Sequence, residues 1–397
     1  MSDEVRRSHT SSRTEGFTES VIREMTRRCS IVDGVNLAQG FPDFDPPEEL
    51  VEAASRAMRD GYNQYSITWG SPRLRRAICE KVRRYNGIDA DPDANVTVTC
   101  GATEAMMSAM LAIIDPGDEV VIFEPYYENY GPDAIISGAK PVYVPLIEPD
   151  FHFDPEALRA AFSDAVKAVI INTPHNPSGK VFTREELEYV SELCGKYDAL
   201  VVTDEIYEHI LFDGAQHVSP GSVAGLEDRT ITISGMSKTY SATGWRVGWA
   251  IAPEHITGAI RKVHDFLTVG APAPLQEAGV VAMSLPEQYY ANLAEFYRHK
   301  RDIICSELSK VGFTPFVPAG AYYVLTDFTS VSDKNDFAFA IYLVEEVGVA
   351  TVPGGSFYST AELGANKIRF AFCKTEETLR EAVDRLSKLR SAPRAER

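Results

Sequence analysis

The segment TITISGMSK, residues 230–238, decides how this chain is interpreted. Its first five residues are rich in β-branched side chains, a composition typical of a buried strand. Small residues then lead to Lys238, and Gly244-Trp245-Arg246 follows a few residues later. Most lysines lie on solvated loops, and Lys238 alone is as consistent with such a loop as with a crowded site. The rest of the chain has to distinguish the two.

Other short apolar runs resemble the one at 230–234 and read as strands buried on both faces. Helical patterns alternate with them, and the pattern at 184–197 opens with Thr183 and Glu186 in the spacing of a capping box. This alternation predicts an α/β fold with a mainly parallel mixed sheet flanked by helices. The other predicted strands are 119–123, 141–145, 168–172, 199–203 and 248–252, and the other predicted helices are 103–114 and 155–161.

The alternation breaks at Ala271-Pro272-Ala273-Pro274. From about residue 286 the pattern becomes a long helix (287–311), two short strands and a final helix (376–389). We therefore expect a second, smaller α+β domain. The predicted division is an N-terminal arm that joins the small domain (1–45), a large domain (46–285) and the small domain proper (286–397).

Composition narrows the class of protein. The 397 residues include 39 basic and 57 acidic side chains, a net charge of −18, and such a surface repels nucleic acid and anionic membranes. The six cysteines and eight histidines show no metal-binding spacing, so we expect no metal and reduced cysteines. Residues 1–16 are polar and no run of about 18 apolar residues occurs, which predicts a cytoplasmic protein without a signal peptide.

Polar residues follow several predicted strands directly, where ligands bind in open α/β sheets. Gly101-Ala102-Thr103 follows the strand-like segment 96–99 and opens a helix, and Asn176 comes soon after the run that ends at Asn172. Asp204, with Tyr207 three residues later, and Lys238 follow the next two runs. Each alone fits an ordinary turn, a helix N-cap or a tight connection. Together, in this order, they favour one site.

One cofactor, pyridoxal phosphate, would account for this whole set of residues. It needs an amine for its aldehyde, which Lys238 offers, and a carboxylate at its ring nitrogen, which Asp204 offers. A helix that starts at Gly101-Ala102-Thr103 would bind the phosphate, and Arg246 adds a planar cation suited to two phosphate oxygens.

The motifs together resemble those of fold-type I, class I and II aminotransferases. From about Phe17 to the last helix, the chain is most similar to the kynurenine, glutamine-phenylpyruvate and methionine aminotransferase branch of the aspartate aminotransferase superfamily. The motifs are LAQGFPDF (37–44), Asn63-Gln64-Tyr65, Asn176-Pro177-Ser178-Gly179, Asp204-Glu205-Ile206-Tyr207, Ser237-Lys238-Thr239 and Gly244-Trp245-Arg246.

The resemblance implies a pyridoxal-phosphate enzyme and a homodimer. Lys238 would hold the cofactor as a Schiff base and move protons, with a pKa lowered by burial and by Arg246, while Asp204 would pair with the ring nitrogen. Relatives often bind phosphate through a serine or threonine where this chain has Gly235, so Ser237 or Ser234 would replace it. The resemblance also implies that Tyr207 and Asn176 bond the phenolic oxygen and that Tyr127 stacks on the ring. The phosphate would be bound by Gly101, Ala102, Thr103 and Arg246, and by Tyr65 from the partner subunit. The substrate carboxylate would be bound by Arg369, with Gly40 and Asn176.

Donor preference rests on weaker signals. Aspartate-type relatives place a cation where this chain has Phe266 or Thr103, so we expect neutral, aromatic or methionine-like L-amino acids as donors and a 2-oxo acid as acceptor. Several aromatic side chains could line an apolar pocket: Phe17, Tyr65, Tyr127, Phe266 and Phe357. Phe266 and Phe357 are almost as consistent with core positions. An aspartate- or glutamate-preferring enzyme, with Arg261 turned inward, and a carbon–sulfur β-lyase remain open alternatives.

Overall fold

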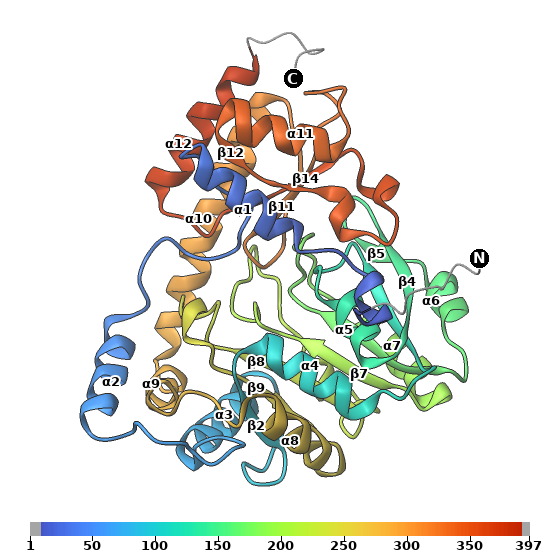
Figure 1. The fold of residues 1–397 in the computed structure, drawn as a ribbon, viewed down its shortest axis with the longest axis vertical. Coiled ribbons are helices and arrows are strands. Elements are labelled where there is room, and N and C mark those ends of the chain that lie inside the picture. Colours follow the sequence, from blue (N-terminus) through green and yellow to red (C-terminus); the bar gives the residue numbers. More distant parts are fainter. Residues whose placement is uncertain (1–8, 391–397) are drawn as a thin grey trace, which may run out of the picture.

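The computed structural model describes residues 9–390 (Figure 1). Residues 1–8 and 391–397 lie outside the described part of the chain, and with them lies half of the polar segment 1–16. The main body is an eight-stranded sheet with helices on both faces, as expected for an α/β protein.

The order of strands in this sheet is β2-β9-β8-β7-β6-β3-β4-β5. Strands β8, β7, β6, β3 and β4 are parallel to one another, and β9, β2 and β5 run antiparallel to their neighbours. The prediction of a mainly parallel mixed sheet is confirmed. The bounds are β2 Val96–Thr99, β3 Glu119–Glu124, β4 Lys140–Ile147, β5 His152–Phe153, β6 Val166–Asn172, β7 Leu200–Asp204, β8 Thr230–Gly235 and β9 Gly248–Ile251.

Alternate side chains of the central strands enter two separate cores, as the two-residue period of a strand requires. Val120 and Ile122 of β3 pack with helices α4 (Ala102–Ile113), α5 (Tyr130–Ser137) and α8 (Glu254–Thr268). Val121 and Phe123 pack on the opposite face with α6 (Pro155–Ala161) and α7 (Arg184–Tyr197). Strand β4 departs from the prediction that its run is buried on both faces, because Pro145 and Ile147 are exposed near the edge of the sheet.

The helix predictions hold closely. Helix α7 has the predicted bounds, and the Thr183–Glu186 capping box is formed in both directions. A third group, α2 (Glu48–Arg59), α3 (Pro72–Tyr85) and α9 (Ala273–Met283), packs together and against strands β2 and β9. No helix of the described residues is long and apolar enough to cross a membrane.

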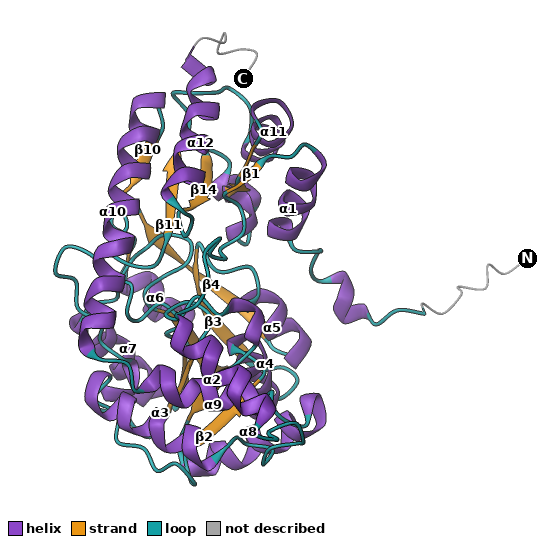
Figure 2. Ribbon diagram, turned by 90° about the vertical axis from the view of Figure 1, so that its left-hand side faces the viewer, coloured by secondary structure: helices purple, strands orange, loops and turns teal. Residues whose placement is uncertain are grey.

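The C-terminal part forms a second sheet, in the order β10-β11-β14-β13. The prediction of two short strands here is wrong, because strands of two or three residues leave no readable pattern. Helix α10 (Glu287–Val311) is confirmed and extends past both sheets (Figure 2), whereas α12 (Glu376–Leu386) ends three residues earlier than predicted. The other bounds are β10 Thr314–Phe316, β11 Tyr323–Asp327, α11 Asp336–Tyr342, β12 Val349–Ala350, β13 Val352–Pro353 and β14 Lys367–Ala371.

The N-terminal arm lies beside this C-terminal part (Figure 1). Helix α1 (Val21–Ile31) contacts β12, and β1 (Val35–Asn36) pairs with β12 in parallel. These contacts support the predicted division at 45 and 286, which stays a prediction. All six cysteines are unpaired, and Cys100 alone among them is not fully buried.

Candidate active site

Three parallel strands end side by side at the point where the predicted residues meet. Strand register pairs Asn172, the end of β6, with Asp204, the end of β7, and pairs Asp204 with Ile233 of β8. Lys238 follows three residues after β8. A cavity of about 520 Å³ lies over these strand ends. The predicted residues that line it are Gly40, Ala102, Thr103, Tyr127, Asn176, Asp204, Tyr207, Ser237, Lys238, Arg246 and Arg369.

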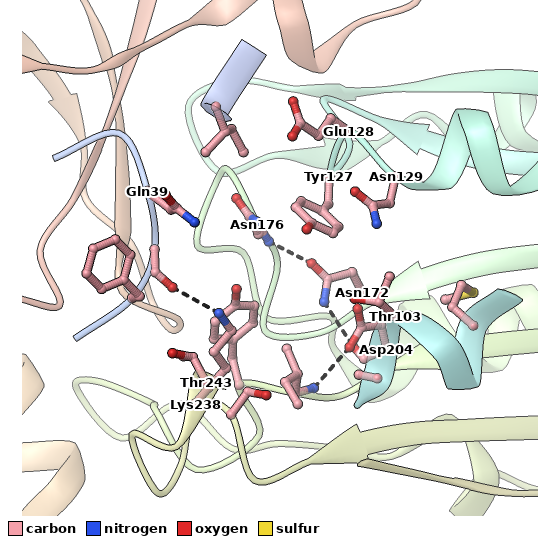
Figure 3. A pocket seen from close by; sticks show the side chains of 18 of the residues that line it. Gln39, Thr103, Tyr127, Glu128, Asn129, Asn172, Asn176, Asp204, Lys238 and Thr243 are labelled. Atoms are coloured by element: carbon pink, nitrogen blue, oxygen red, sulfur yellow. Dashed lines mark hydrogen bonds between the residues drawn. The ribbon is translucent and has the colours of Figure 1, made fainter. Parts of the chain in front are cut away.

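Asp204 is held by hydrogen bonds from three neighbours. The carboxylate Oδ1 accepts a hydrogen bond from the Ile206 N–H (3.2 Å), and Oδ2 accepts one from the Tyr130 hydroxyl (2.9 Å). The third bond fixes the backbone, because the side-chain amide of Asn172 donates to the main-chain carbonyl of Asp204 (2.8 Å). Figure 3 shows the chain of bonds from Asn176 through Asn172 to Asp204. No helix begins here, so the N-cap alternative is wrong. Burial raises the pKa of Asp204 to about 6, against the opposing effect of the Tyr130 bond.

The Lys238 amine reaches across the cavity and donates to the carbonyl of Gly40 (2.9 Å; Figure 3). Burial lowers its pKa to about 8, and the positive charges of Arg246 and Arg369 act in the same direction. The predicted cause of this shift is therefore confirmed. A lysine with this pKa is neutral in a useful fraction of molecules near neutral pH.

The end of the cavity at the start of α4 has the form of an anion site. Gly101 has φ +85°, and a Cβ there would lie 2.6 Å from Nη2 of Arg246, so glycine lets the guanidinium approach the backbone. Helix α4 begins at Ala102, where an α-helix presents N–H groups without intrahelical acceptors. Arg246 itself holds a left-handed φ of +53°.

Gly235, the departure from the family motif, has a steric reason. A Cβ at Gly235 would lie 2.9 Å from the carbonyl oxygen of Val247. Of the two proposed substitutes, the Ser234 hydroxyl donates to Glu208 and points away from the cavity, whereas Ser237 lines it. Ser237 is thus the remaining candidate for this contact.

Arg369 also lines the cavity. It is fully buried in β14, between β11 and β13, and is therefore not a surface charge on an edge strand. Its guanidinium lies 4.3 Å from the Tyr323 ring and 4.9 Å from the Phe357 ring, and donates to Oδ1 of Asn176 (2.9 Å). Its Nε has no partner among the described residues. A Cβ at Gly40 would lie 1.9 Å from the Tyr323 hydroxyl, which accounts for glycine at that position.

Sequence reasoning missed several residues of this site, including Tyr130, Asn172, Tyr323 and Asp133. Tyr130 and Asn172 orient Asp204, while the Tyr323 hydroxyl lies 3.0 Å from that of Tyr207. Asp133 also lines the cavity. None of the four belongs to a motif quoted above, and only the position of Asn172 at the end of a predicted strand offered a signal.

Other predicted residues lie outside the cavity. Tyr65 and Phe266 are 87% and 92% exposed on the surface of the chain, and Phe357 is core rather than pocket lining. The alternative in which Arg261 turns inward is not realised in this structure, because its guanidinium donates to the carbonyls of Asp93 and Val96 (2.8 and 2.7 Å). Phe17 and Gly101 do not line the cavity, although Gly101 contacts Arg246.

A buried polar cluster supports the loop that carries Asp204 and Tyr207. Glu205, Glu208 and His217 lie close enough together to hold a metal ion. The cluster already contains its own cation, because Lys81 forms a buried ion pair with Glu208 (2.5 Å). Asn86 bonds both carboxylates. We therefore interpret the cluster as structural.

Comparison with known proteins agrees with this geometry. The family model for class I and II aminotransferases matches residues 32–386. The chain belongs to this family. It is 38% identical to a probable N-succinyldiaminopimelate aminotransferase of Mycobacterium tuberculosis, over 97% of this chain and 99% of that one. The solved structure of the M. tuberculosis protein superposes with a TM-score of 0.93 and covers 96% of this chain and 100% of that chain.

Two further relatives broaden the comparison. The methionine aminotransferase of Escherichia coli is 36% identical, over 93% of this chain and 96% of that one. The human kynurenine–oxoglutarate transaminase 1 is 35% identical, over 95% and 97%. The protein is thus a pyridoxal-phosphate-dependent aminotransferase, and the predicted enzyme class, fold and cofactor are confirmed.

The residues present fit this cofactor. The glycine at 101 leaves a cradle next to Arg246 that a side chain would fill. Lys238 and Asp204 line the same cavity, and buried polar atoms of Arg369 and Asp133 have no partner among the described residues.

Proposed function

We propose that this aminotransferase transfers the α-amino group of a neutral, aromatic or methionine-like L-amino acid to a 2-oxo acid in amino-acid metabolism. The observation that carries the proposal is that Lys238, Asp204 and the buried Arg369 line the same cavity. A substrate whose α-carboxylate is bound by Arg369 has its α-carbon directed toward Lys238.

Each residue has a proposed role. When bound, pyridoxal phosphate supplies an electron sink for the carbanion formed at the α-carbon. Lys238 would hold the cofactor through its amine and would accept the α-proton as a general base. Asp204, oriented by Tyr130, keeps the ring nitrogen protonated. Gly101, Ala102, Thr103, Ser237 and Arg246 bind the phosphate, Tyr207 and Asn176 bond the phenolic oxygen, and Tyr127 covers the ring.

The substrate carboxylate is bound by a planar, preorganised cation. Arg369 is packed between two aromatic rings and bonded to Asn176, so little rotational freedom is lost when it binds a carboxylate. The carbonyl of Gly40 accepts from both Lys238 and Tyr322, which places the backbone of the N-terminal arm against the reacting amine.

A second candidate donor class carries a distal carboxylate on a long side chain. Arg23 of α1 lines the mouth of the cavity, and its guanidinium has no hydrogen-bond or ion-pair partner within residues 9–390. The M. tuberculosis relative is named for an N-succinyl substrate, which carries such a carboxylate. Thr103 and Phe266 stand where aspartate-type relatives place a cation, and neither is charged. The short side chain of aspartate would therefore have no positively charged partner at these positions.

A matrix of donors and acceptors tests both candidates. We expect methionine and phenylalanine to exceed aspartate with 2-oxoglutarate or pyruvate as acceptor, and a clear preference for aspartate would contradict the proposal. Arg23→Gln is expected to lower kcat/KM for N-succinyldiaminopimelate roughly tenfold and to leave methionine unchanged, because it removes one charged hydrogen bond. Arg27→Gln, one turn away and paired with Glu19, is the matched control.

The β-lyase alternative is tested in the same assay without an acceptor. Pyruvate and ammonia released from a cysteine conjugate would identify lyase activity. We expect release to be slow relative to amino transfer.

We further propose a cytoplasmic homodimer. The exposed aromatic side chains Tyr65 and Phe266 lie in segments that meet at the Thr68–Asp265 contact, beside the exposed Ile67, Leu267 and Val269. An apolar surface of this kind is typical of a subunit interface. Sedimentation should give a dimer at micromolar concentration, and a fully active monomer would contradict the proposal.

A further inference from the structure

Asp133 is a buried carboxyl group that the family motifs do not assign. It lies on α5, is 4% exposed, and lines the same cavity as Asp204. Its Oδ2 is buried and has no hydrogen-bond partner among the described residues. A buried carboxylate without a partner is costly, so this position requires an explanation.

The surroundings of Asp133 connect it to Asp204. Tyr130 lies one turn earlier on α5 and donates to Asp204. Burial, followed by the negative charge of Asp204, raises the pKa of Asp133 to about 8. Two carboxyl groups in one buried space do not both ionise readily.

Within residues 9–390, no cationic side chain pairs with the Asp133 carboxyl group and no hydrogen bond reaches it. Beyond the larger effect of burial, the negative charge of Asp133 raises the pKa of Tyr127 and Tyr130, and neither tyrosine can supply a positive charge to it. Elements packed against α5 carry other titratable groups with contacts of their own or at the surface. They are Glu104 bonded to His264, Lys140 paired with Glu119, Glu124 bonded to the Ser359 N–H, Tyr143 stacked on Tyr126, and Arg13 and Glu15 of the short helix 12–15.

We infer that Asp133 is a second carboxyl group serving the ring-nitrogen end of the cofactor site. It is a neutral acid in the cofactor-free protein and loses its proton to solvent when a planar aromatic cation binds against Asp204. The inference rests on the proposed role of Asp204. Acting through Asp204 and Tyr130, Asp133 is a positioning residue.

The physical argument is a balance of charges. In the cofactor-free protein, the negative charge of Asp204 opposes ionisation of Asp133. A pyridinium cation paired with Asp204 would cancel the negative charge of Asp204 and would also favour a second negative charge nearby. Ionisation of Asp133 then becomes favourable in a space where it was not, and the released proton should be measurable.

Calorimetric titration of the cofactor-free protein with pyridoxal phosphate tests the inference. Titrations at pH 7.5 in buffers of different ionisation enthalpy give the number of protons released. We expect wild type to release about half a proton more than Asp133→Asn, which has the same shape and cannot ionise. If Asp133→Asn folds poorly, Asp133→Ser, a smaller neutral variant, takes its place and should show the same reduced proton release. Asp228→Asn changes an exposed carboxyl group and should match wild type.

A second readout does not involve the cofactor. Because the folded-state pKa of Asp133 is raised, its contribution to stability is present at low pH and lost as pH rises from about 4 to 8. The melting temperature of the cofactor-free wild type should therefore fall relative to Asp133→Asn over this range. Equal proton release and parallel melting curves would overturn the inference. Full amino-transfer activity retained by Asp204→Asn would instead refute the proposed role of Asp204.

Discussion

Lys238 is the residue on which the chemistry depends, and two measurements test it at this scale. Replacing it with alanine removes the only amine that lines the cavity among the described residues. We expect Lys238→Ala to lose the visible absorbance of the bound cofactor and to reduce turnover by roughly 10²–10⁴-fold or more, since a positioned base contributes that much. Lys262→Ala, an exposed lysine, is the control, and amino transfer retained by Lys238→Ala would contradict the assignment.

The lowered pKa of Lys238 can be measured directly in the cofactor-free protein. A lysine amine reacts with acylating reagents only when it is neutral. With a pKa of about 8, the reaction rate of Lys238 should rise about tenfold per pH unit below 8 and level off above it, whereas an ordinary lysine continues to gain up to about pH 10.4. Peptide mass spectrometry after brief labelling gives the rate for each lysine. A rate still rising between pH 9 and 10 would contradict the shift.

At the scale of elements, the loop after β7 depends on the ion pair between Lys81 of α3 and Glu208. Both side chains are 3% exposed. Burial alone would raise the pKa of Glu208, but the charge and hydrogen bond of Lys81, together with the charges of His209 and His217, outweigh it and lower that pKa to about 2. Lys81→Met leaves a buried, unpaired carboxylate and should cost about 3–5 kcal/mol of unfolding free energy at pH 7.

The pH dependence of this effect has a definite sign. A depressed carboxyl pKa contributes stability above about pH 4.5 that is lost as pH falls toward 2. The difference between wild type and Lys81→Met should therefore narrow in acid, as measured by urea unfolding. Lys140→Met, which breaks the exposed pair with Glu119, should cost no more than about 1 kcal/mol. Equal costs for the two variants would show that the buried pair contributes nothing special.

At the scale of the whole molecule, shared sites predict complementation between two inactive variants. If Tyr65 serves the partner subunit, a mixed dimer of Lys238→Ala and Tyr65→Ala subunits contains one site with both defects and one intact site. Refolding the two variants together should restore roughly a quarter of wild-type activity, because half of the dimers are mixed and each has one good site. Activity no greater than the sum of the separate variants would contradict shared sites.

How much was predictable depended on local signal. The bounds of α7 and α10 were read directly because capping residues and long periodic patterns are encoded by neighbours in sequence. The short strands β12 and β13 were missed because two residues carry no period, and they exist only through pairing with β1 and β14. Exposure of part of β4 was missed because apolar composition does not reveal which strand lies near an edge.

The sequence by itself determined the fold class, the cofactor and the motif residues, because strand ends, glycine turns and the lysine segment are local and chemically specific. Only the tertiary structure decided that Arg369 is buried between two rings, that Tyr130, Tyr323 and Asp133 join the site, and that Tyr65 and Phe266 lie on the surface of the chain. Those facts depend on packing between segments far apart in sequence. No local pattern records which side chains such packing brings together.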